Sequence, residues 1–302
     1  MVKIVPFIDR NFWIFLFAGL ALGLSYPAYS EQLMFLLMPL IMIMMFLVFL
    51  KTDFVHVINE IKNYKLIVYL VFAYMIIIPV VLFLVVNQFD ERIAIGILLL
   101  TAMPAAVASP AIADIVNGNT ALSISITIAT SIAAPFTIPL IFSFLDAHQL
   151  SIEPWQIFLD LIIMVFVPMV ASQILRNYFK KIIERKKHYI TPVNMLVLSL
   201  MIYIVIGSQR ESLLTLSEDL VLKLGILYLL FILLHAIGYL LAFRQSRPNK
   251  ISICIGMAYM NNGLAIVLAA KYFDPHILVL MMLSELPWDT LIVPFRKVLR
   301  HI

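Results

Sequence analysis

Long apolar stretches separated by short polar ones repeat along the whole chain, and roughly 20 apolar residues suffice to cross a bilayer as a helix. We therefore predict an all-α membrane protein with ten transmembrane helices, at residues 11–27, 32–50, 66–86, 91–116, 120–145, 154–175, 190–207, 219–243, 250–272 and 275–296. Residues 52–63 carry apolar positions at helical spacing, which predicts a short helix lying on the membrane surface.

Two of the predicted spans contain residues that interrupt a helix. In the fourth span, Pro104 and Pro110 are separated only by small residues, and each proline removes a backbone donor and clashes with the preceding turn. In the ninth span, Asn261, Asn262 and Gly263 interrupt the apolar run. Opened backbone inside a bilayer must be satisfied by protein or by a watery cavity. One interrupted helix in each half therefore predicts a transporter whose site lies between them.

The ten spans divide into two halves, residues 1–148 and 149–302, with five spans each. Because five is odd, the second half must enter the membrane with the opposite orientation. The interrupted span is the fourth in both halves, which indicates an inverted repeat whose broken helices cross in mid-membrane. Small side chains favour close helix approach, so we expect the two to meet at Ala108 and Gly263.

Composition and charge agree with a membrane protein. Of the 302 residues, 63% are hydrophobic and 13% charged, whereas soluble domains have roughly 45–50% and about 25%. With both termini inside, 17 of the 21 Lys and Arg residues fall on inner segments, as the positive-inside tendency predicts. We therefore expect a multi-pass protein of the inner cell membrane, with cytoplasmic termini and the lipid bilayer as its partner. The net charge of +4 requires no nucleic acid.

The run PAAVASPAIADIVNGNTALSISITIATSIAAPFTIP, followed later by LLHAIGYLLAF and MNNGLA, resembles motifs of the bile acid:sodium symporter family. The resemblance extends from about residue 66 to the end and points to a divergent member of bacterial type. It implies a panel of spans 1, 2, 6 and 7 beside a core of spans 3–5 and 8–10. It also implies a secondary active transporter working by alternating access, with sodium and a small organic anion bound at the crossing and no other cofactor.

The resemblance assigns three hydroxyl residues to the sodium site: Ser109, Ser123 and Thr127. Ser123 and Thr127 are four residues apart on one helix, so both can point at one ion. Alternatively, these hydroxyls bond only to their own helix. Other family ligands are replaced, because Tyr74, Gly256 and Met260 stand where the family has amide or carboxylate side chains. Since cations need such oxygens, we expect one sodium site to be lost and the other weakened.

The tenth span places two carboxylates, Glu285 and Asp289, four residues apart within an apolar run, with Pro287 between them. A carboxylate at the bilayer centre costs about 3 kcal/mol even on the lenient insertion scale. We therefore predict that the pair relays a proton or cation, which leaves coupling to sodium or to protons open. Alternatively, Glu285 is protonated and bonded to a neighbouring helix, or both groups lie near a wet end of the span.

Substrate contacts are predicted where polar side chains meet the two breaks. Asn261 and Asn262 carry amides that can both donate and accept hydrogen bonds. Together with Ser109, Thr127 and Asp289 they form the predicted substrate site.

Two other classes of function remain for comparison. An intramembrane enzyme would use Glu285, Asp289 and His235 as an acid–base group, but the sequence contains neither HExxH nor GxSxG. A membrane receptor would not need two broken helices. A buried histidine such as His235 is more often a core residue than a functional one. From these comparisons we predict a transporter that is not an enzyme.

Overall fold

The computed structural model describes residues 12–52, 64–144, 153–215 and 217–299, and within these ranges the chain is helical with no strand. Residues 53–63, which make up nearly all of the predicted surface helix, lie outside the described residues. The chain divides into two compact units. Unit 1 comprises Met1–Asp53 and Ile162–Leu216, and unit 2 comprises Phe54–Leu161 and Ser217–Ile302.

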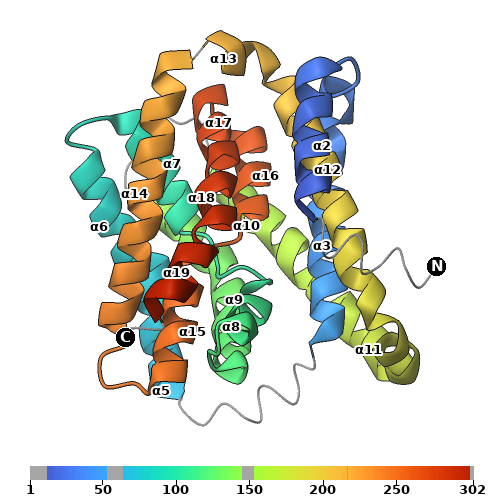
Figure 1. The fold of residues 1–302 in the computed structure, drawn as a ribbon, viewed down its shortest axis with the longest axis vertical. Coiled ribbons are helices and arrows are strands. Elements are labelled where there is room, and N and C mark those ends of the chain that lie inside the picture. Colours follow the sequence, from blue (N-terminus) through green and yellow to red (C-terminus); the bar gives the residue numbers. More distant parts are fainter. Residues whose placement is uncertain (1–11, 53–63, 145–152, 216, 300–302) are drawn as a thin grey trace. The chain divides into compact units, whose positions relative to one another are not determined.

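Unit 1 is built from two pairs of packed helices, α2 with α12 and α3 with α11 (Figure 1). Its elements are α2 (Phe12–Ser25), η1 (Glu31–Leu36), α3 (Leu37–Lys51), η3 (Ile162–Phe166), α11 (Val167–Lys186), η4 (Lys187–Tyr189), α12 (Ile190–Ser208) and α13 (Arg210–Thr215). Two side chains bond to carbonyl groups of α2, one from the middle of α12 and one from the start of α13. The Ser199 hydroxyl donates to the Phe15 carbonyl at 2.6 Å, and Arg210 Nε donates to the Leu24 carbonyl at 2.7 Å.

Unit 2 contains the two broken helices, and α14 lies alongside α15 while α8 lies against α9 (Figure 1). Its elements are α5 (Tyr64–Phe72), η2 (Ala73–Ile77), α6 (Ile78–Val86), α7 (Glu91–Thr101), α8 (Ser109–Ile115), α9 (Thr120–Phe144), α10 (Pro154–Leu161), α14 (Ser217–Leu241), α15 (Arg247–Ala258), α16 (Asn262–Tyr272), α17 (Pro275–Leu283), α18 (Glu285–Thr290) and α19 (Ile292–Leu299).

Several of these helices have the length and hydropathy of membrane spans. Five qualify among the described residues: Glu31–Lys51, Tyr64–Val86, Thr120–Phe144, Pro154–Ser208 and Leu220–Leu241. A sixth candidate is the pair Pro275–Thr290 and Ile292–Val298, which is bent by 41°. The chain is therefore a helical, multi-pass membrane protein.

Proline shapes two of the long helices without ending them. The π-helical turns η2 and η3 lie just before Pro79 and Pro168. A proline lacks the backbone donor that would continue the α-helical ladder, and a wider π turn is one way in which a helix accommodates it.

Two helices differ in extent from the spans predicted for them. The sixth predicted span ends at residue 175, whereas α11 continues to Lys186. The tenth is divided into α17, α18 and α19, with junctions at Ser284 and Leu291, and Pro287 lies inside α18.

Candidate functional site

The first break lies between α7 and α8. Helix α7 ends at Thr101, and α8 begins at Ser109 with Pro110 in its first turn. The intervening residues are mostly buried, Ala102, Met103, Ala105 and Ala106 being at most 5% exposed. Buried peptide groups outside a helix need other partners.

These partners come from the second break, between α15 and α16. The Ala106 N–H donates to the Tyr259 carbonyl, and the Asn261 N–H donates to the Pro104 carbonyl, both at 2.8 Å. The two bonds form an antiparallel bridge between Ala105 and Met260. The two interrupted segments therefore pair main chain to main chain, in the manner of two very short strands.

The expected meeting point at Ala108 and Gly263 is wrong. Ala108 is exposed and Gly263 is half-buried, and the pairing occurs at Ala105 and Met260 instead. The segments meet where the breaks leave backbone donors and acceptors without helical partners. Small side chains at Ala108 and Gly263 do not by themselves set the meeting point.

Hydroxyl groups from α8 and α9 surround this bridge. Ser109 Oγ donates to the Tyr259 carbonyl at 3.3 Å, and Thr127 Oγ1 donates to the Ala106 carbonyl at 3.4 Å. Both bonds are long. The Tyr259 carbonyl also accepts the bridge bond from the Ala106 N–H, and the Ala106 carbonyl belongs to the residue that donates that bond. Ser123, one turn from Thr127 on α9, has a buried hydroxyl without a hydrogen-bond partner in the described part of the chain.

Two further side chains contact the bridge and were missed by the sequence analysis. Thr130 Oγ1 accepts a hydrogen bond from the Ala105 N–H at 3.1 Å. Trp288 Nε1 donates to the Met260 carbonyl at 3.0 Å. Thr130 follows Thr127 by three residues and so shares its helix face, which is the signal that could have identified it.

The two asparagines play different parts. The Asn261 side-chain oxygen accepts from the Leu264 N–H at 3.1 Å and so caps the start of α16, a common use of asparagine. Asn262 Nδ2 donates to Ser284 Oγ at 2.9 Å. Its side-chain oxygen is buried and has no partner among the residues placed by the structure, which leaves one acceptor available.

The two carboxylates lie on α18, next to the bridge. Glu285 and Asp289 are both half-buried, and Asp289 is close enough to Glu285 and to the Tyr259 phenol to interact electrostatically. The ring of Tyr259 in turn packs edge-on against Trp288, with centroids 5.3 Å apart. The acidic pair, the aromatic rings and the backbone bridge therefore form one continuous region.

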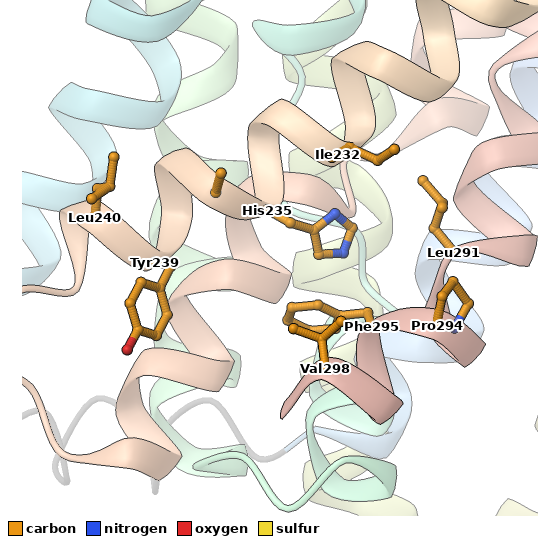
Figure 2. Close-up of a pocket in the computed structure, with 9 residues that line it drawn as sticks. Ile232, His235, Tyr239, Leu240, Leu291, Pro294, Phe295 and Val298 are labelled. Carbon is orange, nitrogen blue, oxygen red and sulfur yellow. The ribbon is translucent and has the colours of Figure 1, made fainter. Parts of the chain in front are cut away.

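His235 lies beside this region but faces a different space. Its Nδ1 bonds to the Phe231 carbonyl at 2.7 Å, and its ring packs against Tyr259 and Phe295. It lines an apolar pocket of about 510 Å³ between α14 and α19 (Figure 2). Within the described ranges, no hydrogen bond or ion pair joins His235 to Glu285 or Asp289.

The ring of Tyr74 packs closely against Gly256 of α15. The Tyr74 hydroxyl donates to the Ile253 carbonyl at 2.5 Å. A Cβ added at Gly256 would lie 3.0 Å from Ile126 Cγ2 and 3.2 Å from Tyr74 Cε2. A longer side chain at Gly256 would therefore collide with the tyrosine ring.

Comparison with known proteins gives consistent relatives. Residues 38–216 match the sequence model of the Sodium Bile acid symporter family. The chain is 27% identical over 285 residues to YocS, named an uncharacterized sodium-dependent transporter, from Bacillus subtilis, with 90% of this chain and 85% of that protein covered. It is 27% identical over 188 residues to BASS1 of Arabidopsis thaliana, named a probable chloroplastic sodium/metabolite cotransporter, and 26% identical over 190 residues to BASS2 of Oryza sativa, named likewise. It spans 45% and 44% of these two plant proteins.

Proposed function

Because the chain belongs to the Sodium Bile acid symporter family, we propose that it is a secondary active transporter that moves a small organic anion together with sodium. The observation that carries this proposal is the backbone bridge at Ala105 and Met260, where the hydroxyls of Ser109 and Thr127 reach carbonyl oxygens. Broken helices that meet within a membrane are typical of ion and solute sites in transporters.

The proposed sodium site consists of Ser109, Ser123 and Thr127, with the carbonyl oxygens of Tyr259 and Ala106. Sodium is bound by uncharged and charged oxygen atoms, as other hard cations are. The unpartnered Ser123 hydroxyl and the two long hydroxyl–carbonyl bonds support the proposal, because an ion could draw these oxygens together without breaking shorter bonds. We propose no cofactor other than the transported sodium ion.

A matched pair of variants tests this site. In proteoliposomes, Ser123→Ala should raise the sodium concentration for half-maximal uptake at least tenfold, because it removes a buried oxygen that no other described residue hydrogen-bonds. Ser125→Ala is the control, since the Ser125 hydroxyl is also on α9 but bonds to the Ala121 carbonyl of its own helix at 2.9 Å. Equal sodium dependence in the two variants would remove Ser123 from the site.

The solute is proposed to bind beside the bridge, in contact with Ser109, Thr127, Asn261, Asn262 and Asp289. The free acceptor of Asn262 supports its part in this set. Asn261 contributes less directly, since its side chain already caps α16. Loss of uptake in Asn262→Ala, with sodium binding retained, would distinguish a solute contact from an ion ligand.

Proton coupling through Glu285 and Asp289 is a second candidate mechanism. It is favoured by the proximity of two half-buried carboxylates that have no basic partner in the described part of the chain. Uptake should be measured under an imposed pH gradient and, separately, an imposed sodium gradient. Accumulation driven by pH alone, and lost in Glu285→Gln or Asp289→Asn, would establish it. Strict sodium dependence with both variants active would refute it.

Alternating access is proposed to divide the chain into a panel and a core. The division into unit 1 and unit 2 supports this, since unit 1 contains the first, second and seventh predicted spans and unit 2 contains the third to fifth and eighth to tenth. The sixth span crosses the boundary at Leu161. We further propose ten spans arranged as two inverted repeats, residues 1–148 and 149–302, in the inner cell membrane with both termini cytoplasmic.

A further inference from the structure

The end of α11 has a feature that neither transport nor the bridge explains. The apolar part of this helix ends near Leu175, but the helix continues to Lys186 and changes direction at Phe179, whose φ of −122° and ψ of 24° are not helical. The residues that follow, 180–187, have the sequence KKIIERKK. We refer to residues 178–187 as the basic segment.

The basic segment concentrates positive charge on an exposed surface. All of its basic side chains are exposed: Lys180, Lys181, Arg185, Lys186 and Lys187. Its acid, Glu184, is already engaged, because Arg176 Nη2 and Lys187 Nζ contact its carboxylate at 2.8 Å and 3.0 Å. These two contacts lower the pKa of Glu184, that from Lys187 having the larger effect. The segment therefore presents a net positive charge to its surroundings.

Apolar side chains are exposed among these charges. Tyr178 is 80% exposed, Phe179 49% and Ile182 54%. Exposed aromatic and aliphatic groups next to basic ones, directly after an apolar helix, are typical of segments at the boundary between hydrocarbon and headgroups. A purely solvated charged surface would not require them.

The opposite face of the segment is fixed to unit 1. Ile183 packs in a buried cluster with Leu50 and Ile190. Arg176, itself buried, donates from Nη1 to the Leu50 carbonyl at 2.9 Å while it holds Glu184. The backbone of the segment is thus immobilised before any ligand binds, which reduces the entropic cost of binding.

We propose that the basic segment is a binding site for anionic phospholipids of the leaflet at this end of α11. Its charge complements phosphate headgroups, and its aromatic and aliphatic residues reach the acyl boundary beside the apolar part of the helix. A basic residue near an anionic membrane surface contributes about 1 kcal/mol, or roughly fivefold in affinity. Several such residues on one anchored segment therefore give a strong preference for anionic over zwitterionic lipid.

The test counts the lipids that the purified full-length protein retains. The protein in neutral detergent is titrated with phosphatidylglycerol and, separately, with phosphatidylcholine, and bound lipid is counted by native mass spectrometry. The wild type should retain phosphatidylglycerol at least tenfold better than phosphatidylcholine. A variant with all five basic residues of the segment replaced by Gln should lose this preference.

A matched variant removes the same amount of charge elsewhere. It carries Gln in place of five basic residues of unit 2: Arg244, Arg247, Lys250, Arg296 and Lys297. The preference should persist in this control. Equal loss in both variants, or no preference in the wild type, would overturn the proposal.

Two further experiments test whether the acyl chains are needed and provide single substitutions in case the five-residue variant does not fold. Glycerol phosphate at the concentration of the lipid should not displace phosphatidylglycerol, because it lacks the acyl chains that Tyr178 and Ile182 would contact. Efficient displacement would mean that the site takes a free phosphate ester, which also overturns the proposal. If the five-residue variant does not fold, Lys180→Gln and Lys186→Gln should each reduce the preference by about fivefold, and no change in either would count against it.

Discussion

Gly238 allows α14 to approach α15 at the point where α15 leads into the second break. A Cβ added at Gly238 would lie 2.7 Å from the Cα atom of Cys254 and 3.1 Å from Met257 Cβ. The nearest of these atoms belongs to the backbone, so rotation of a side chain cannot relieve the contact. We predict that Gly238→Ala forces the two helices apart and impairs both stability and transport.

The size of the effect follows from the geometry and from a control on the same helix. Moving from 2.7 Å to ordinary contact at 3.4–4 Å requires a separation of about 0.7–1.3 Å at this point, and overpacking of this kind typically costs about 1–3 kcal/mol. Alanine also gains about 0.5–1 kcal/mol over glycine inside a helix. Gly225, also on α14, has no neighbouring atom of the described residues within 4 Å of its added Cβ. The helix-propensity gain is common to both positions, so the two variants should differ in free energy of unfolding by about 1–3 kcal/mol.

The assay compares Gly238→Ala with Gly225→Ala by denaturant unfolding in detergent and by uptake in proteoliposomes. Gly225→Ala should be as stable as the wild type or slightly more so, with normal uptake. Gly238→Ala should be less stable and should transport at least fivefold more slowly, because displacement of α15 strains the 2.8 Å bond from Ala106 to the Tyr259 carbonyl. Equal stability of the two variants would refute the packing argument. Reduced stability with normal uptake would refute the link to the bridge.

Two further predictions concern single hydrogen-bonding groups. Tyr74→Phe should lower the free energy of unfolding by about 0.5–1.5 kcal/mol in the same assay, since the Ile253 carbonyl loses its 2.5 Å side-chain donor; an unchanged value would show that the bond contributes little. Glu184→Gln should lower the melting temperature at neutral pH, and the difference from the wild type should vanish only once the pH falls below the lowered pKa of Glu184. The contacts from Lys187 and Arg176 lower the pKa of Glu184, so the stability they provide is present above the ordinary carboxyl pKa and is lost as the pH falls through the folded-state value. A difference that persists at low pH would assign the effect to packing instead.

The positions of the helices could be predicted from the sequence because apolar length and proline act locally. Pro104 and Pro110 predict the first break, since each lacks a donor wherever it lies in a helix. The second break was expected at Asn261, Asn262 and Gly263, but it ends with Asn261 as the cap of α16. Asparagine is common in both interrupted segments and helix caps, so sequence pattern alone does not separate the two roles.

The arrangement of the site could be predicted only in part. The resemblance identified Ser109 and Thr127, which the structure brings to the backbone bridge. It did not point to Thr130 or Trp288, whose partners are main-chain groups at Ala105 and Met260. Those groups become available only when two segments more than 150 residues apart come together. Hydropathy likewise ends a span where charge begins, although a helix such as α11 can continue beyond its apolar part.

The bridge at Ala105 and Met260 joins the broken helices through peptide groups, and peptide groups are the same in every amino acid except for the missing donor of proline. Mutations around this junction can therefore accumulate over evolutionary time without dismantling it, provided that Ala106 and Asn261 do not become proline. A lineage built on such a junction can acquire a new solute by exchanging the neighbouring side chains while it inherits the crossing unchanged.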